Sequence, residues 1–188
     1  MKQTIVLITG GSCSGKSEMT TFFRNALVVD MDRFYKKLTD IPKDKDGNLN
    51  FDTPEAVDIA ECAQAVKMLM KTGSVKMPLY DMKKNDRVGW ETIKVKKTDK
   101  FIIVEGLFAF YEPLRSLGDI KIFLNTPAEM RIARRMLRDI KRKGNLNYED
   151  TLKAFIAAER GYKKYVQTMH QYADVTIPFS FNPLQLNQ

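Results

Sequence analysis

The chain has 188 residues, a length that predicts one domain spanning residues 1–188. Its hydrophobic share of 44% and charged share of 29% are those of a folded globular protein and exclude a disordered chain. The 31 Lys and Arg residues outnumber the 23 Asp and Glu residues, and the formal charge of +8 suits a polyanionic partner such as a nucleotide triphosphate or a nucleic acid.

Two features of the chain bear on its location. The two cysteines, Cys13 and Cys62, are far apart and show no metal-ligand spacing, as expected in a reducing compartment. The apolar run at 4–10, TIVLITG, is too short to span a bilayer, and no cleavage-site pattern follows it. We therefore expect a cytoplasmic protein with no membrane partner.

The start of the chain predicts two strands separated by a glycine loop and a helix. Residues 4–8 are continuously apolar and rich in β-branched side chains, which is typical of a strand buried on both faces. After the glycines, residues 16–25 are predicted to form a helix, and residues 26–30, ALVVD, a second strand. The helix should turn these side chains inward: Met19, Phe22 and Phe23.

The next segment predicts a loop, a long helix and a hairpin. Residues 38–50 are polar and rich in turn formers. A helix of about 18 residues should begin with Thr53 as its cap and Pro54 in its first turn, and end at Gly73. The alternating segments at 74–98 then predict a small hairpin inserted outside the main sheet.

The remaining elements complete an α/β pattern. The predicted elements are strands at 100–106, 119–126 and 173–178 and helices at 127–144 and 148–169. The helix at 127–144 carries apolar residues near helical spacing and fills its other face with Arg and Lys. Strands separated by helices throughout predict a mostly parallel sheet flanked by helices.

The glycine loop at 10–17, GGSCSGKS, matches G-x-x-x-x-G-K-[ST] and lies between a predicted buried strand and a helix, as this phosphate-binding motif requires. Glycines let successive backbone N–H groups face one anion, the lysine reaches the outer phosphates, and the last serine offers a hydroxyl to Mg²⁺. The predicted ATP-binding residues are Gly10, Gly11, Ser12, Cys13, Ser14, Gly15, Lys16 and Ser17.

Acidic residues at strand ends indicate that the nucleotide is used and not only bound. The chain has no guanine-reading N-K-x-D, which disfavours a GTPase. Glu105 ends an apolar strand in the manner of a Walker-B acid, so we assign it to the Mg²⁺ shell with Ser17. Strand alternation places Asp30 and Asp32 on one side, where either could take a proton from an acceptor hydroxyl. The structural alternative is that Asp30 caps the next segment and Asp32 is a solvated loop residue.

Six ordered motifs resemble the uridine kinase branch of the phosphoribulokinase and uridine kinase family, which has the P-loop NTPase fold. In this sequence they read DRFYK, FDTPEAVD, PLYDMKKNDR, IIVEGLFAFY, IKIFLNTPAEMRIARRMLRDI and YADVTIP. They cover all of the chain except its last few residues. The resemblance implies an ATP- and Mg²⁺-dependent kinase of a nucleoside.

The resemblance also implies roles for single residues. Asp32 would be the base for a nucleoside 5'-hydroxyl and a Mg²⁺ neighbour, Asp52 would hold the ribose hydroxyls, and Tyr80 would contact the base. Tyr35 would shape the pocket, and Lys16 would act on the phosphates. An Arg-rich lid at about 131–147 would close over the transferring phosphate. The remaining implied residues are Arg135 and Arg138 in the lid, and Met82, Asn85 and Arg87 at the substrate.

Three departures from the family pattern concern the substrate, the lid and adenine. The family's base-reading His is Asn85 here, and Met82 stands where it has an aromatic ring, although Asn can still donate to and accept from a base edge. Two lid arginines are replaced by Lys143 and Asn145, and lysine lacks the planar fork of arginine. The sequence FSFNP at 179–183 replaces the usual Gly-Gly near adenine.

We predict a kinase of uridine or cytidine first. The departures leave open a kinase of another hydroxylated metabolite, such as nicotinamide riboside, pantothenate or a sugar phosphate. A non-catalytic nucleotide- or nucleic-acid-binding module is disfavoured, because such a module has no need of Asp32 beside Lys16 and Ser17. A homo-oligomer stays open, and the single histidine, His170, is expected at the surface and not in catalysis.

Overall fold

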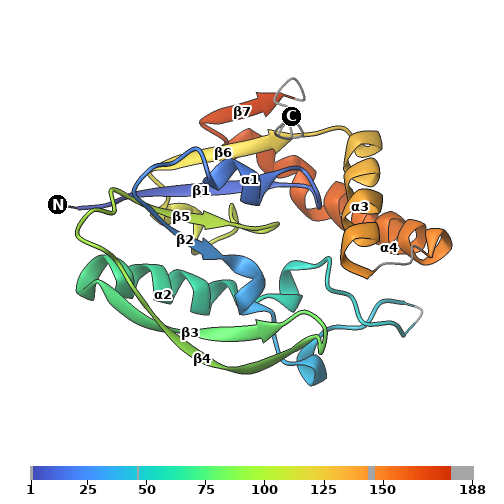
Figure 1. The fold of residues 1–188 in the computed structure, drawn as a ribbon, viewed down its shortest axis with the longest axis horizontal. Helices are drawn as coiled ribbons and strands as arrows, with labels where there is room; N and C mark the ends of the chain where they lie inside the picture. Colours follow the sequence, from blue (N-terminus) through green and yellow to red (C-terminus); the bar gives the residue numbers. More distant parts are fainter. Residues whose placement is uncertain (1, 46, 144–146, 179–188) are drawn as a thin grey trace.

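The main sheet has five parallel strands in the order β2-β5-β1-β6-β7 (Figure 1). The computed structural model describes residues 2–45, 47–143 and 147–178. The strands are β1 (Thr4–Gly10), β2 (Ala26–Asp30), β5 (Phe101–Glu105), β6 (Ile120–Asn125) and β7 (Val175–Pro178). The predicted α/β class with its parallel sheet is confirmed.

The strand register brings the ends of three strands to one edge. In β1, Ile8 lies opposite Glu105 of β5, and Glu105 lies opposite Asp30 of β2. Because the strands are parallel, the loop that follows β1 and the acids that end β2 and β5 share the carboxyl edge, where open α/β sheets bind ligands.

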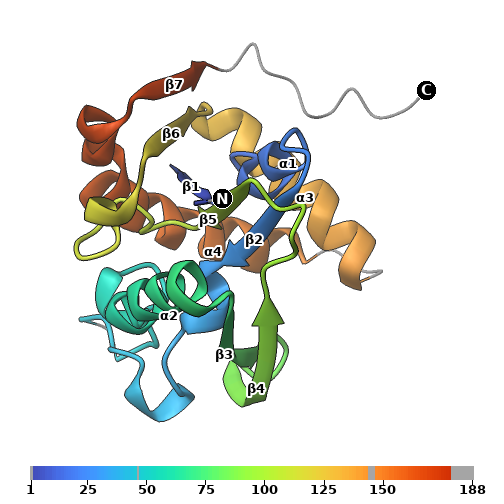
Figure 2. The ribbon, with the colours of Figure 1, turned by 90° about the vertical axis from the view of Figure 1, so that its left-hand side faces the viewer.

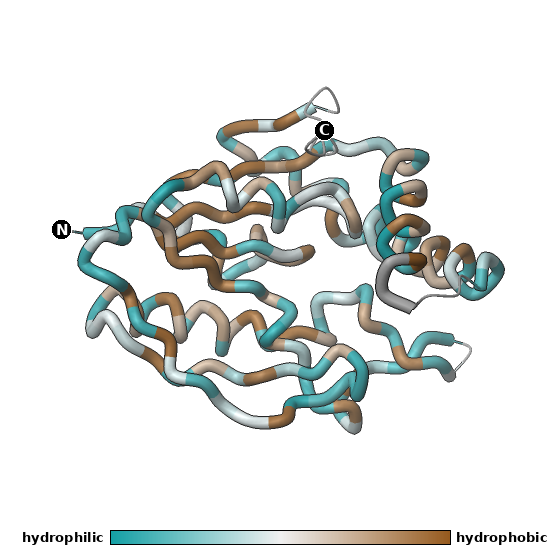
Figure 3. The backbone as a smooth tube through the Cα atoms, viewed as in Figure 1, coloured by the Kyte–Doolittle hydropathy of each residue, from teal (hydrophilic) through white to brown (hydrophobic). Residues whose placement is uncertain are grey.

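Alternate residues of the strands pack into two cores on opposite faces of the sheet. On one face Leu7, Val104 and Phe123 pack with α2 (Ile59–Thr72) and with the C-terminal helical segment at 162–172. On the other face Ile8 and Leu124 pack with Met19 of α1 (Lys16–Thr20) and with Phe23, which follows that helix. Figure 2 shows α1 and α2 on opposite sides of the sheet, and Figure 3 shows hydrophobic residues concentrated along its central strands.

The first helix is shorter than the sequence predicts. Helix α1 covers only Lys16–Thr20, although a helix was expected to residue 25. The hydroxyls of Thr20 and Thr21 donate to backbone carbonyls three residues earlier at 2.7 Å, which competes with regular helix continuation. Of the residues expected to face inward, Met19 and Phe23 pack against the core, whereas Phe22 is 63% exposed.

The second helix begins later than predicted and ends where predicted. Residues Pro54–Ala56 form a 3₁₀ turn, and α2 covers Ile59–Thr72. Its cap is Asp58, whose carboxylate accepts a hydrogen bond from the Glu61 N–H at 2.8 Å. Thr53, the predicted cap, instead donates its hydroxyl to Glu55. The helix stops at Gly73, whose φ of 72° lies in the left-handed region that favours glycine.

The predicted hairpin forms its own two-stranded sheet outside the main one. Strands β3 (Ser74–Asp81) and β4 (Asp86–Lys94) pair antiparallel. The turn between them contains Asn85 with a φ of 51°, a conformation that asparagine tolerates better than most residues.

Helices α3 and α4 lie beside the carboxyl edge of the sheet (Figure 1). Helix α3 covers Ala128–Lys143, and α4 covers Tyr148–Gly161 and continues as a π-helical turn (Tyr162–Val166) and a 3₁₀ helix (Gln167–Tyr172). No helix within the described ranges is long and apolar enough to cross a membrane.

Helix α3 leaves part of its apolar face exposed. Leu137 is 50% exposed and Ile140 is 42% exposed, whereas Arg131 is only 2% exposed and Asp139 is also buried. The helix turns its charged side toward the cleft described below, because the arginines there find backbone carbonyls and carboxylates to bind.

Candidate active site

A cleft of about 1070 Å³ opens at the carboxyl edge of the sheet, between the loop after β1, the hairpin, α3 and α4. Fifteen of the predicted site residues line it: Ser12, Cys13, Ser14, Gly15, Lys16, Ser17, Asp32, Tyr35, Asp52, Tyr80, Met82, Asn85, Glu105, Arg135 and Arg138. Three others, Gly10, Gly11 and Arg87, are not among the lining residues.

The loop after β1 has the curled backbone of a phosphate-binding loop. Gly15 has a φ of 101° and Cys13 a φ of 60°, so the chain twice enters the left-handed region between β1 and α1. The Lys16 Nζ donates to the carbonyls of Gly10 and Gly11 at 3.2 Å each. The ammonium group therefore lies over the loop, where it can meet a bound phosphate.

Glu105 and Ser17 already contact each other at the base of the cleft. The Ser17 hydroxyl donates to Oε1 of Glu105 at 2.5 Å. Glu105 is 5% exposed, and its burial raises its carboxyl pKa, an effect that Lys16 and the Ser17 hydrogen bond oppose. The described residues contain no group of three or more His, Cys, Asp or Glu side chains placed to hold a metal ion. A serine hydroxyl with one carboxylate instead fits Mg²⁺, which keeps several waters and uses few protein ligands.

Asp30 and Asp32 do not lie on a common strand, so the prediction from strand alternation is wrong. Strand β2 ends at Asp30, and Met31–Phe34 form a 3₁₀ turn. The Asp30 carboxylate caps this turn by accepting a hydrogen bond from the Asp32 N–H at 2.9 Å. Capping of the next segment is the alternative role that the sequence allowed for Asp30. Both carboxylates nevertheless line the cleft.

The environment of Asp32 suits proton transfer. Burial, and then the neighbouring Asp30 carboxylate, raise the pKa of Asp32 to about 7, although Lys16 pulls it down. A carboxyl group that titrates near neutral pH can take a proton from a hydroxyl far better than one of ordinary pKa.

Aromatic rings and a buried acid form the opposite wall. The Tyr35 ring lies 5.4 Å from the Tyr80 ring and 5.7 Å from that of Phe51, which the sequence analysis did not single out. The Tyr80 hydroxyl is buried and has no hydrogen-bond partner among the described residues. Burial raises the carboxyl pKa of Asp52, and Arg135 opposes this shift. This wall therefore offers a hydroxyl and a carboxylate to a polar ligand.

The hairpin contributes Met82 and Asn85 to the rim of the cleft, and Met82 is 57% exposed. Arg87, predicted at the substrate, binds protein instead. Its Nε donates to the Tyr35 carbonyl at 2.7 Å, its Nη2 donates to the Phe34 carbonyl at 3.2 Å, and it forms an ion pair with Glu61 at 2.8 Å. Arg87 thus fastens the hairpin to the segment that carries Asp32.

Arginines of α3 form the third side of the cleft. Arg134, Arg135 and Arg138 line it. The Arg134 Nη1 donates to the Ser14 carbonyl at 3.1 Å, while Nε and Nη2 of Arg134 and Nε of Arg135 are buried without a hydrogen-bond partner among the described residues. These donors can bind an anion. Of the two lid substitutions, Lys143 ends α3, and Asn145 lies outside the described residues.

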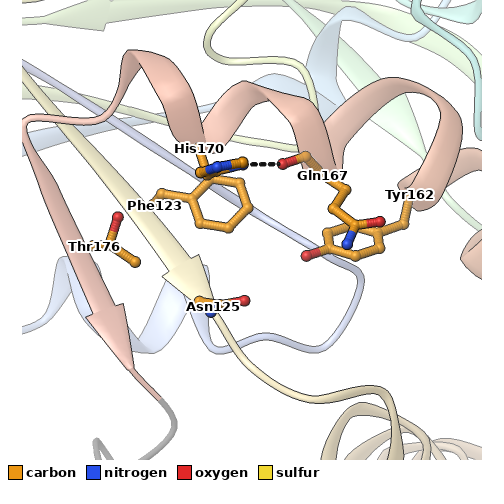
Figure 4. Close-up of a pocket in the computed structure, with 6 residues that line it drawn as sticks. All are labelled: Phe123, Asn125, Tyr162, Gln167, His170 and Thr176. Carbon is orange, nitrogen blue, oxygen red and sulfur yellow. Dashed lines mark hydrogen bonds between the residues drawn. The ribbon is translucent and has the colours of Figure 1, made fainter.

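A second, smaller cavity of about 190 Å³ lies between β6, β7 and the C-terminal helical segment (Figure 4). His170 lines it, and its Nδ1 lies 2.8 Å from the Gln167 carbonyl. His170 is exposed, as predicted, and this cavity shares no described lining residue with the cleft.

Comparison with known proteins relates most of the chain to one group of enzymes. Residues 5–182 match the Phosphoribulokinase / Uridine kinase family. The uridine kinase of Bacillus pumilus is 34% identical over 185 residues, which cover 94% of this chain and 87% of that enzyme. The uridine kinase of Borrelia garinii is also 34% identical, over 180 residues that cover 93% of this chain and 85% of that enzyme.

A solved structure agrees on the fold. The phosphoribulokinase from Rhodobacter spheroides superposes with a TM-score of 0.67 over 99% of this chain and 75% of that one, at 16% sequence identity. At this identity the likeness bears on the fold alone, and it agrees with the parallel sheet flanked by helices described above.

Proposed function

The chain belongs to the Phosphoribulokinase / Uridine kinase family and is an ATP-dependent phosphotransferase acting on an alcohol group, and from this premise we propose that it phosphorylates the 5'-hydroxyl of a nucleoside, uridine or cytidine first. The observation that carries the proposal is the meeting of Asp32 with the phosphate loop in one cleft. A carboxyl with a pKa of about 7 beside Lys16 suits a base for an acceptor hydroxyl, and pure nucleotide binding has no use for one.

The donor half of the proposal rests on the phosphate loop and α3. Lys16 and the loop N–H groups would hold the ATP phosphates, and Arg135 and Arg138 would stabilise charge on the transferring group. Ser17 and Glu105, with Asp32 nearby, would hold Mg²⁺, which when bound neutralises phosphate charge.

The acceptor half rests on the wall opposite the loop. Asp52 would accept from ribose hydroxyls, the Tyr80 hydroxyl would bind the base edge, and Tyr35 would pack against the nucleoside. The cleft of about 1070 Å³ exceeds the range of roughly 300–1,000 Å³ usual for a single small ligand, so it has room for ATP and an acceptor together.

Asn85 and Met82 favour one second candidate, a kinase of the same chemistry with another acceptor. Both line the cleft, and neither offers the ring or imidazole of the family pattern. An acceptor that needs no stacking on the hairpin, such as nicotinamide riboside, pantothenate or a sugar phosphate, would fit this rim.

The test is an assay of the purified protein with Mg²⁺, ATP and a panel of acceptors, read as phosphorylated product. We expect uridine or cytidine to give kcat/KM at least about tenfold above every other acceptor, the discrimination that one or two well-formed hydrogen bonds supply. Preference for nicotinamide riboside, pantothenate or a sugar phosphate would establish the second candidate. ATP binding with no product from any acceptor would refute both.

A further inference from the structure

Arg131 differs from the other arginines of α3 because it is buried under the phosphate loop. We propose that Arg131, held in place by Glu159, is the positioning residue of that loop and the reason that Gly11 must be a glycine. This inference rests on the proposed function only in taking the loop to bind the phosphates of ATP.

The guanidinium of Arg131 is fixed on several sides. Its Nε donates to the Thr126 carbonyl at 2.9 Å, and its Nη2 contacts Glu159 of α4 at 2.6 Å. Its Cζ lies 4.4 Å from the centre of the Tyr162 ring. Arg131 is 2% exposed, so a shift of the guanidinium would leave a buried charge and a half-buried carboxylate without their partners, which is unfavourable.

The fixed guanidinium occupies the space beside Gly11. A Cβ at Gly11 would lie 2.5 Å from Nη1 of Arg131 and 2.8 Å from its Cζ, closer than real Cβ contacts allow. Gly11 stands at a variable position of G-x-x-x-x-G-K-[ST], and its φ lies outside the left-handed region, so neither the motif nor the backbone conformation demands a glycine. Glycine is required because the Arg131 guanidinium occupies the space that a Cβ would need.

Neighbouring residues support the next part of the loop from the same direction. The Thr126 hydroxyl donates to the Ser14 carbonyl at 3.0 Å, and the Arg134 Nη1 donates to the same carbonyl at 3.1 Å. The loop is therefore braced at the Ser14 carbonyl and at Gly11 by the β6–α3 junction and α3. The Ser14 N–H donates to the Gly11 carbonyl within the loop, and contacts to carbonyls leave the other N–H groups of the loop to the phosphates. Preorganisation of this kind raises affinity without touching the ligand.

The experiment is a double-mutant cycle on the full chain with Gly11→Ala, Arg131→Ala and the double variant. The readouts are the Kd of a fluorescent ATP analogue, the KM values for ATP and acceptor, and the melting temperature. We expect each single variant to weaken ATP binding about tenfold or more, with the acceptor KM changed less than about twofold. The double variant should bind ATP no worse than the weaker single one, because removal of the guanidinium makes room for the new methyl group.

Two further variants separate positioning from general stability. Glu159→Gln keeps the size of its side chain but removes the charge that holds Arg131, and should weaken ATP binding in the same direction by a smaller factor. Lys153→Ala removes an exposed ion pair with Glu149 on the same helix and should change nothing. If Arg131→Ala does not fold, Glu159→Gln takes its place in the cycle with Gly11→Ala.

If the losses of ATP affinity in the two single variants multiply in the double variant, the two positions act independently, and the proposal is overturned. A fall in melting temperature with unchanged ATP affinity would also overturn it, by reducing Arg131 to a structural residue. The binding readout needs no acceptor, so a wild-type protein that binds ATP and phosphorylates nothing would refute the proposed function and leave this inference intact.

Discussion

The donor and acceptor sides of the cleft are built in different ways. The proposed donor side is built around one contiguous segment of eight residues, 10–17, where β1 passes into α1, with the arginines of α3 beside it. The acceptor wall is assembled from three separate segments that contribute Asp32 and Tyr35, then Asp52, then Tyr80 and the hairpin rim. A contiguous loop fixes its chemistry locally, whereas an assembled wall depends on how its segments are fastened together.

The fastening of the acceptor wall is visible in the hairpin. Arg87 binds the carbonyls of Phe34 and Tyr35, and Arg33 pairs with Glu91 of β4 at 2.8 Å. The hairpin therefore sets the position of the turn that carries Asp32. Within the described residues, Met82 and Asn85 on its rim make no contact that fixes this turn in the way that Arg87 does, so substitutions at the rim should leave Asp32, the proposed base, in place.

One turn of α4 touches both sides. Glu159 binds Arg131 beneath the phosphate loop, and two residues later a Cβ at Gly161 would overlap the carbonyl of Asp52 in the acceptor wall. The two sides are thus separate in sequence, but both contact the last turn of α4. A displacement of this turn would therefore alter both sides.

The largest difference between an effect on turnover and an effect on ATP binding is expected from Asp32→Asn. The amide keeps the shape of the side chain but cannot take a proton, so kcat should fall about 10³-fold, while the Kd for ATP stays within about twofold or tightens. Turnover by product formation and ATP binding by fluorescence titration measure the two effects.

The control for this prediction is Asp40→Asn, which changes an exposed carboxylate that does not line the cleft. It should alter neither quantity. Retained turnover in Asp32→Asn would place the base elsewhere, and a parallel loss of ATP affinity would mean that the two sides are not separable.

Local patterns predicted the donor side well for physical reasons. A strand buried on both faces requires a continuous apolar run, and 4–8, which leads into the phosphate loop, and 101–105 both show one. The phosphate loop is recognisable because its glycines, lysine and serine are adjacent in sequence. No long-range contact is needed to read either feature.

The differences between expectation and structure fall where long-range contacts override the local pattern. The periodicity of α3 distinguishes two faces, and Arg131 of its charged face is buried in an ion pair with Glu159 of another helix. Strand alternation fails at Asp32 because Asp30 caps a 3₁₀ turn there. The motif that contains Arg87 does not show that this side chain binds the carbonyls of Phe34 and Tyr35 and pairs with Glu61.

A smaller effect, confined to the acceptor side, is expected from Tyr80→Phe. The Tyr80 hydroxyl is buried and has no hydrogen-bond partner in the part of the chain that the structure describes, so its loss removes no bond seen there and should leave the melting temperature unchanged or slightly higher. If it binds the acceptor, the acceptor KM should rise about tenfold, the worth of one hydrogen bond, with the ATP KM unchanged.

Tyr111→Phe is a matched control with the opposite signature. The Tyr111 hydroxyl donates to the Tyr165 carbonyl at 2.9 Å, away from the cleft lining. Its loss should lower the melting temperature and leave both KM values unchanged. An unchanged acceptor KM in Tyr80→Phe would remove Tyr80 from the acceptor wall.

The smallest expected effect is a pH dependence of stability that originates at Asp32. Its pKa is raised from 3.8 to about 7 in the folded protein, so between these values the folded state holds a proton that the unfolded state has lost. The stability contributed by this proton is fully present below pH 4 and is lost as the pH rises through about 7. Asp32→Asn has no such loss, so its melting temperature should exceed that of the wild type by a few degrees more at pH 8 than at pH 5. Melting curves without ligand measure the gap, and for Asp40→Asn it should stay constant with pH. A constant gap in Asp32→Asn would mean that the carboxylate is solvated in the folded protein, and the acceptor side would then lack the buried base that distinguishes it from the donor loop.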